Sequence, residues 1–383
     1  MAKRKCIMLA GIASLAALIG LGAVAGAQQG GQPGTPVAEN YKGLTTDRSY
    51  QPTPKVDAGE GGTSRTYPSV RVAPIGDQLR MDYRIDPFYK KALTIGSIVV
   101  IGSDRVSDWA MLEAAYTFDH QLHDSPQWVH DALSTSKVRH AILAVVEYTM
   151  DLPENNRNGR NSAVADGAYQ DRRSRGLGGL PQCSSGEENL LNLRGDPYGG
   201  NGGQGSGENI TIHEFSHTVA SAIAAVQGRD GPFWTRLRGA LAAAKAPGGR
   251  LEIFNRNRAD NPVYASTNEQ EYWAEGAQAW FDNANPNNAG GIATREQVKE
   301  KDPLLAALLI EIYGDGPWRY IKTTARKPDG SMLRPKEELA HLEGLDELRP
   351  QIPAFNFNNS PRIIAARQQG IQPAAPARGA ANR

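Results

Sequence analysis

The sequence predicts an α+β fold with a mixed sheet, built as one large domain of two lobes. Two short apolar runs, at 97–101 and 138–146, have the length and residue types of buried strands. Between them, residues 108–120 carry apolar side chains at helical spacing, among them Met111 and Phe118. No strand–helix repeat continues past these elements, so the pattern favours α+β over a doubly wound α/β sheet.

Residues 1–27 have the features of an export signal. A positively charged start at 3–5 precedes an almost wholly apolar stretch at 7–24, and the small residues 25–27 form a cleavage site before Gln28. We therefore expect a secreted or periplasmic protein with no stable membrane span after cleavage. An uncleaved membrane anchor is the alternative, because the apolar stretch is long.

Composition divides the rest of the chain into three parts. Residues 28–64 are rich in Gly, Pro, Gln and Thr and predict a disordered linker, and residues 353–383 predict a disordered C-terminal tail. Residues 65–352 lie between them and form the expected domain. The chain has 42 Lys and Arg against 41 Asp and Glu, with no basic block. This balance excludes a nucleic-acid partner, which requires a clustered positive face.

The run His213-Glu214-Phe215-Ser216-His217 has the H-E-x-x-H pattern, and apolar residues on both sides continue a helical spacing. Residues four apart lie on one face of a helix, so the two imidazoles can direct nitrogens at one metal ion. Glu214 lies beside that ion, where its carboxylate can take a proton from a water molecule. The pattern predicts a zinc hydrolase helix; two solvated histidines with an unrelated glutamate are the alternative.

A second helix is expected to begin at Thr267, with Gln270 as its capping-box partner. Glu271 and Glu275 are four residues apart on it, and therefore share a face. We assign Glu271 to zinc and Glu275 to the spare N–H of His213. An exposed acidic face is the alternative, but this helix is largely apolar, and buried acids need a partner.

These two motifs resemble one family. H-E-F-x-H followed by Y-x-x-T-N-E-x-E, two aromatic residues and A-E resembles the catalytic domain of anthrax lethal factor and its secreted relatives. These are zinc metallopeptidases of the HExxH-plus-Glu (gluzincin) type, with a zincin-like fold. The resemblance implies one Zn²⁺ held by His213, His217 and Glu271, with Glu214 as general base. It also implies that Tyr264 stabilises the oxyanion, and that the partner is a peptide or protein substrate.

The resemblance covers the two helices closely and the rest of the chain weakly. Ser216 stands where lethal factor has glycine, and nothing resembles the receptor-docking or substrate-binding domains of that toxin. We therefore expect a zinc metalloendopeptidase without a toxin role. Two alternatives stay open: a zinc-dependent amidase acting on cell-wall peptide, and a zinc-stabilised binding protein without turnover.

Further segments carry weaker signals. Residues 188–193 are nominated as an edge strand that binds extended peptide, and the glycine-rich stretch 199–207 as a flexible lead-in that could act as a lid. The cluster 171–175, Asp-Arg-Arg-Ser-Arg, is interpreted as a solvated loop, with a processing site or a substrate contact as alternatives.

Cysteine and histidine outside the main motif have simple explanations. Cys183 is the single cysteine of the expected mature chain, and is interpreted as a packed side chain rather than a switch that plugs the zinc site. His120 and His123 are interpreted as residues of a wet helix end, with a second metal site as the alternative.

Overall fold

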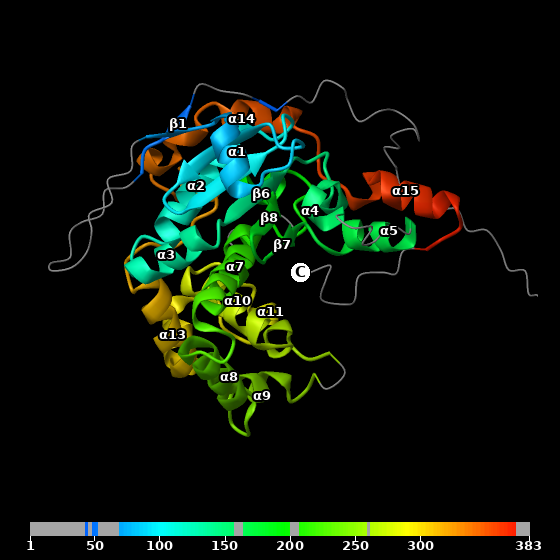
Figure 1. The fold of residues 1–383 in the computed structure, drawn as a ribbon. Coiled ribbons are helices and arrows are strands. Elements are labelled where there is room, and N and C mark those ends of the chain that lie inside the picture. Colours follow the sequence, from blue (N-terminus) through cyan, green and yellow to red (C-terminus); the bar gives the residue numbers. More distant parts are fainter. Residues whose placement is uncertain are drawn as a thin grey trace, which may run out of the picture. The chain divides into compact units, whose positions relative to one another are not determined.

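Figure 1 shows a computed structural model of the chain, which describes residues 43–44, 48–52, 69–156, 164–199, 207–258 and 261–372. All of these residues belong to one compact unit. The expected export signal lies outside the described residues. Within the described residues, no helix combines the length and the apolar character needed to cross a bilayer.

A six-stranded mixed sheet forms the first part of the fold. In spatial order its strands are β3 (Ala73–Pro74), β4 (Lys91–Ile95), β5 (Ile98–Gly102), β6 (Arg139–Leu143), β8 (Gln182–Gly186) and β7 (Gly176–Leu177). Strands β5, β6 and β8 are parallel, and the other pairs are antiparallel. A separate short ladder joins β1 (Ser49–Tyr50) to β2 (Val70–Arg71).

Helices make up most of the remaining structure. The helices before and including the H-E-x-x-H residues are α1 (Asp77–Tyr83), α2 (Asp108–Gln121), α3 (Gln127–Thr135), α4 (Pro153–Asn156), α5 (Val164–Arg173), α6 (Glu187–Leu190) and α7 (Ile210–Gln227). Those that follow are α8 (Pro232–Lys245), α9 (Arg250–Asn255), α10 (Glu269–Trp280), α11 (Pro286–Ala289), α12 (Arg295–Lys301), α13 (Pro303–Tyr313), α14 (Leu345–Leu348) and α15 (Pro361–Gln368). Short 3-10 helices are η1 (Thr149–Asp151), η3 (Tyr264–Ser266), η4 (Lys336–Leu342), η5 (Arg349–Gln351) and η6 (Phe357–Asn359).

The sheet is buried on both faces: every residue of β5 and β6 is buried, and most of these residues are apolar. Val100 and Ile142 belong to a large cluster with residues of α2, α3 and α7. Val99 and Leu143 point the other way and pack with Tyr89 in a smaller cluster. This alternation follows from the period of two residues along a strand. The predictions of a strand at 97–101 and of a helix at 108–120 are confirmed by β5 and α2. The strand predicted at 138–146 is confirmed by β6 but is shorter, since β6 ends at Leu143.

One hydrophobic core joins the sheet to the helical part that follows α7. The large cluster contains residues of β5, α2 and α7 together with those of α8, α10 and α13. Helix α7 lies between the sheet and these later helices (Figure 1). The described chain is therefore mixed α and β with a mixed sheet, and its two expected parts share a continuous core rather than separate ones.

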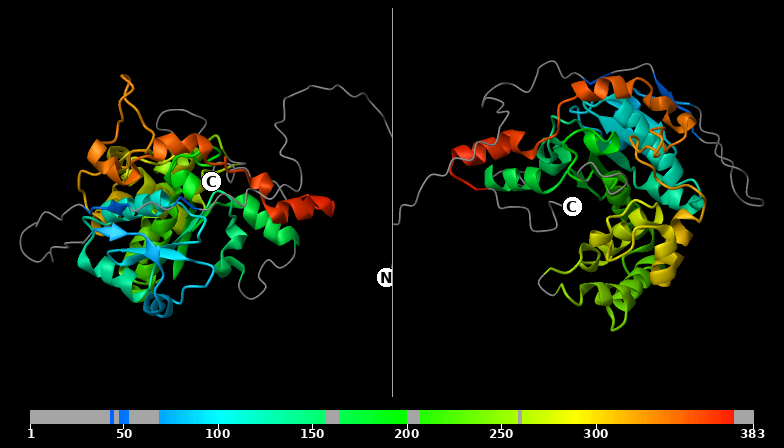
Figure 2. Two further views of the ribbon diagram at one scale, coloured as in Figure 1. Left: turned by 90° about the horizontal axis from the view of Figure 1, so that it is seen from above. Right: turned by 180° about the vertical axis from the view of Figure 1, so that it is seen from behind.

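Two expected boundaries are wrong. Ser49–Tyr50 forms strand β1 inside the expected linker, and Tyr50 is only 5 % exposed. Residues 353–372 are described and contain α15, where the tail was expected. Helix α15 lies beside α5 in Figure 1 and in both views of Figure 2. Ile363 and Ala366 of α15 pack against Ala168 of α5, a contact that composition alone did not reveal.

A buried ion pair anchors the chain just before β7. The guanidinium of Arg175 donates to both carboxylate oxygens of Glu188, at 2.7 and 2.8 Å, and both side chains are fully buried. The same guanidinium donates to the carbonyl oxygen of Ala144. The backbone N–H of Arg175 donates to the hydroxyl of Tyr198. These bonds connect the edge strand β7 to the loop after β6.

We expect Glu188→Ala to lower the free energy of unfolding by about 3–5 kcal/mol, because it leaves the Arg175 guanidinium buried without a counter-charge. The exposed pair of Arg238 and Asp230 is the control, and Asp230→Ala should change stability by at most about 1 kcal/mol. Urea unfolding measures both. Equal losses in the two variants would contradict the role given to the buried pair.

Candidate metal centre

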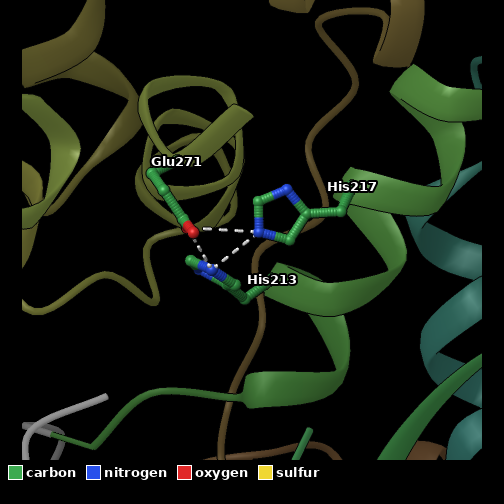
Figure 3. A group of neighbouring side chains, drawn as sticks. All are labelled: His213, His217 and Glu271. Carbon is green, nitrogen blue, oxygen red and sulfur yellow. Dashed lines mark hydrogen bonds and ion pairs between the residues drawn. The ribbon is translucent and has the colours of Figure 1, made fainter. Parts of the chain in front are cut away.

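Helix α7 carries the H-E-x-x-H residues and is fixed at its start. The side-chain oxygen of Asn209 accepts hydrogen bonds from the backbone N–H groups of Thr211 (2.9 Å) and Ile212 (3.3 Å). These bonds satisfy donors that the first turn of a helix leaves unpaired. His213 and His217 project from one face of α7 toward α10 (Figure 3).

Helix α10 holds Glu271 opposite the two imidazoles. Its N-cap is Asn268, whose side chain accepts from two backbone N–H groups, both at 2.9 Å. The prediction of Thr267 as the N-cap is therefore wrong by one residue. The indole N–H of Trp273 donates to the carbonyl oxygen of Ser216 at 2.9 Å, across the two helices. This buried bond fixes the register of α10 on α7, and with it the position of Glu271.

Ser216 also holds α7 from the side away from the imidazoles. Its hydroxyl donates to the carbonyl oxygen of Ile212 (2.7 Å) and accepts from Gln121 (3.2 Å) and Tyr313 (3.0 Å). Ser216 is fully buried. Ser216 thus connects α7 to α2 and α13, and it lies outside the pocket that contains the candidate ligands.

His213, His217 and Glu271 place three metal-binding atoms together (Figure 3). The Nε2 atoms of the histidines are 3.1 Å apart, and Oε2 of Glu271 lies 3.3 Å from Nε2 of His213 and 3.2 Å from Nε2 of His217. In a tetrahedral zinc site with bonds of about 2.0–2.1 Å, ligand atoms are about 3.3–3.4 Å apart. The three donors therefore have the type and the spacing of three corners of such a site. Among the described residues, no other such group of His, Cys, Asp and Glu is present.

The hydrogen bond behind His213 fixes its tautomer. Nδ1 lies 2.9 Å from the amide oxygen of Gln278, whose own N–H group donates to the carbonyl oxygen of Asn209. Since the amide oxygen can only accept, Nδ1 carries a proton and Nε2 is the nitrogen that faces the site. The expected partner was Glu275, but its Oε1 is 3.9 Å from Nδ1, too far for a hydrogen bond. That prediction is wrong, and Gln278 takes the role.

Glu275 is nevertheless buried next to His213. Burial, reinforced by the neighbouring carboxyl of Glu208, raises the pKa of Glu275 well above its ordinary value. Its Oε2 has no hydrogen-bond partner among the described residues. The shorter distance, 2.9 Å to Gln278 against 3.9 Å to Glu275, shows that Nδ1 of His213 is bonded to the amide and not to this carboxyl group.

Without a metal ion, a protonated histidine balances the negative charge of Glu271. Burial alone would raise the pKa of Glu271, but its hydrogen bonds with His213 and His217 outweigh burial and hold that pKa far below its ordinary value. Burial alone would lower the pKa of His213, but the carboxylates of Glu271, Glu214 and Glu275 raise it to about 10. The protonated imidazole of His213 therefore supplies the positive charge beside these carboxylates. A metal ion would replace its Nε2 proton.

Glu214 lines the same pocket and lies under strand β7. A Cβ atom added to Gly176 would lie 2.7 Å from Cγ of Glu214, and one added to Gly178 would lie 2.5 Å from Cβ of His217. Only glycine lets this strand approach the helix so closely. Burial raises the pKa of Glu214, while His213 and His217 oppose the rise. A carboxyl with a raised pKa is suited to accept and return a proton.

The expected peptide-binding strand at 188–193 is wrong. Residues Glu187–Leu190 form helix α6, and its side chains are buried rather than presented to a substrate. The edge strand near the site is instead β7. It lies at one end of the sheet, where its neighbour is β8. Gly176 and Leu177 of β7 line the pocket. Nothing in the sequence of this two-residue strand marks it as one.

Tyr264 reaches the pocket from η3, on the side of α10. The pocket has a volume of about 160 Å³ and is lined by His213, Glu214, His217, Tyr264 and Glu271, among others. The ring of Tyr264 is nearly parallel to that of His213, with ring centres 6.3 Å apart and planes 20° apart. Every residue named for the site by the sequence therefore lines one pocket, including Glu275. Gln278, Gly176 and Gly178 were not foreseen, and Arg173 was noted only within the cluster 171–175, for which a substrate contact was an alternative.

Cys183 and His140 form a separate buried contact, away from the candidate ligands. Sγ of Cys183 lies 3.0 Å from Nδ1 of His140, and both residues are almost completely buried. Burial raises the pKa of the thiol to about 12 and lowers that of His140 to about 3. Cys183 is therefore a packed, neutral thiol, and it does not occupy the metal-facing pocket.

Comparison with known proteins adds one distant similarity. No family model and no curated protein matches the sequence. Among solved structures, the chain is similar to the Pro-Pro endopeptidase PPEP-2 from Paenibacillus alvei, with 18 % identity. The match covers 52 % of this chain and 90 % of the other, with a TM-score of 0.29. At that score the similarity carries no argument about the fold or the activity of this chain.

The raised pKa of His213 gives a direct prediction for metal-free protein. Its imidazole should stay protonated at neutral pH and lose its proton only as the pH rises through about 10, because the neighbouring carboxylates favour the cation. Nitrogen NMR of labelled histidine should show both ring nitrogens protonated at pH 8, and zinc should remove the proton from Nε2 alone. Titration of His213 near the ordinary value of about 6.5 would contradict this account.

Gln278 should matter more for metal binding than Glu275. We expect Gln278→Ala to weaken zinc binding by about 10–100-fold, because His213 loses the acceptor that fixes its ring and tautomer. Glu275→Gln is the matched comparison on the same helix and should weaken binding less. Zinc affinities from competition with a chelator measure both. A larger loss in Glu275→Gln would return the orienting role to Glu275.

Proposed function

We propose that this chain is a zinc metallopeptidase with a zincin-like active site. The observation that carries the proposal is the convergence of His213, His217 and Glu271 at the spacing of a tetrahedral site, with Glu214 and Tyr264 in the same pocket. A structural zinc site uses four protein ligands. Here the described residues supply three, an arrangement that leaves a position open for chemistry.

The residues around that position have separate tasks. A zinc ion in this site would polarise the scissile carbonyl and lower the pKa of a water molecule from 15.7 to about 7. Glu214 takes the proton from that water and later delivers it to the nitrogen of the leaving amine. Gln278 keeps the Nε2 lone pair of His213 directed at the site, so the ligand needs no rearrangement.

Tyr264 and β7 act on the substrate. The hydroxyl of Tyr264 donates a hydrogen bond to the oxygen that becomes negative as the carbonyl is attacked, a contribution of about 2–4 kcal/mol for a well-placed donor. Strand β7 ends the sheet and lines the pocket, so we assign to it the binding of an extended peptide by strand addition. Export, with Gln28 as first residue of the mature chain, completes the proposal.

Three substitutions separate chemistry from metal binding. Glu214→Gln should keep metal and fold and lose nearly all turnover, because it removes the base and no ligand. His217→Ala should lose the metal. Tyr264→Phe should lower kcat by about 10²–10³-fold with little change in KM, because the donor acts in the transition state. Glu269→Gln and Tyr169→Phe, which change residues outside the pocket, are the matched controls.

Cleavage of an unspecific protein substrate, zinc content and thermal unfolding measure these outcomes. Equal hydrolysis by wild type and Glu214→Gln would refute the peptidase and favour a zinc-stabilised binding protein. Normal kcat in Tyr264→Phe would remove only the oxyanion role. Hydrolysis of cell-wall peptide without hydrolysis of protein would move the substrate to that amide class.

A further inference from the structure

The arginines of the cluster at 171–175 have three different positions. Arg175 is buried with Glu188, as described above. Arg172 and Arg173 form the last turn of α5, and both side chains are partly buried. Arg173 lines the pocket that contains the candidate metal ligands, and Arg172 does not. The cluster is therefore not a uniform solvated loop.

Arg173 is the single arginine or lysine among the described residues that line this pocket. The carboxyl groups of the pocket have other neighbours: Glu271 faces the histidines, Glu214 lies under β7, and Glu275 is buried behind His213. Arg173 acts electrostatically on Glu214 without forming an ion pair with it. Among the described residues, Arg173 makes no ion pair, and its side chain donates one hydrogen bond, to Gln170 at 3.3 Å. A cation at the pocket wall is thus available to a ligand.

The backbone under Arg173 is held in place from both sides. Asp171, two residues earlier, is buried and accepts hydrogen bonds from the backbone of Met150 (2.8 Å) and the hydroxyl of Ser360 (2.6 Å). Ser360 begins α15, which packs beside α5 (Figure 2). Arg175, two residues later, is fixed by Glu188. Because the backbone on both sides is fixed, the guanidinium of Arg173 can reach only a limited region of the pocket, which lowers the entropy lost when it binds a ligand.

We propose that Arg173 recognises a carboxylate of the substrate and makes this enzyme selective for peptides with an acidic group near the scissile bond. A guanidinium offers a planar fork of N–H donors that fits a carboxylate with two parallel hydrogen bonds. The carboxylate is either an Asp or Glu side chain or the C-terminus of the peptide. The inference rests on the proposed peptidase function, and it narrows the substrate class.

Three degenerate decapeptide libraries distinguish the sources of the carboxylate. All are N-acetylated: one has a fixed central Glu and a C-terminal amide, one a fixed central Gln and an amide, and one a fixed central Gln and a free C-terminal acid. Asp and Glu are left out of the degenerate positions. Release of new amines gives kcat/KM for wild type, Arg173→Ala, Arg173→Lys and the matched control Arg172→Ala. Labelled libraries also report binding to Glu214→Gln and to the double variant Glu214→Gln with Arg173→Ala.

Wild type and Arg172→Ala should prefer one acidic library over the Gln amide library by about 10–100-fold, the range for a hydrogen bond to a charged group. Arg173→Ala should lose that preference, and Arg173→Lys should keep part of it. Preference for the central Glu identifies a side chain as the ligand, and preference for the free acid identifies the C-terminus.

Equal hydrolysis of the three libraries by wild type would overturn the proposal and leave the peptidase standing. An Arg173→Ala enzyme that keeps the preference for acid would also overturn the proposal. The same holds if Arg173→Ala changes only the pH profile of kcat, since Arg173 would then act on Glu214 and not on the substrate. Absence of hydrolysis in every library would refute the proposed function. In that case binding decides: selective binding of acid that depends on Arg173 supports recognition, and unselective binding overturns it.

Discussion

The packing of α7 against α10 determines where every candidate metal-binding atom lies. The histidines come from one helix and Glu271 from the other, so the distances between them depend on how the helices are registered. The buried bond from Trp273 to the carbonyl of Ser216 sets that register. The hydrogen bond from His213 to Gln278 adds a second connection one turn nearer the start of α7. Both bonds join backbone or amide groups in the core, where an unpaired polar group is costly.

Buried charge is the second constraint on this centre. Glu208, Glu214 and Glu275 have pKa values raised by burial, and Glu271 keeps its charge because two histidines face it. The buried charge of Glu271 needs a cation beside it. In metal-free protein the proton on His213 supplies it, and the same geometry offers a divalent ion the same position. Acid conditions should therefore oppose metal binding, since protons and metal compete for Nε2.

The parts of the site that depend on helical spacing could be predicted from the sequence. His213 and His217 share a face because they are four residues apart, and Glu271 followed from a second helix with the same rule. Gln278 lies seven residues beyond Glu271, two turns along the same face, so helical spacing also made it a candidate partner of His213. Glu275 has the same kind of spacing and an acidic side chain, and was therefore predicted instead. Strand β7 carried no signal: two residues form it, and its place over Glu214 depends on glycines and on buried contacts far apart in the sequence. The order of 353–372 was missed for the same reason, because α15 is stabilised by packing on α5 rather than by its composition.

Anomalous diffraction at the zinc edge, from crystals of the purified full chain with zinc, locates the metal ion itself. We expect one strong peak within about 2.0–2.2 Å of Nε2 of His213, Nε2 of His217 and one carboxylate oxygen of Glu271. We also expect the amide oxygen of Gln278 to remain bonded to Nδ1 of His213 in that structure. A peak bound by Glu275 or Glu269 in place of Glu271, or the absence of a peak between α7 and α10, would show that these three residues are not the zinc ligands.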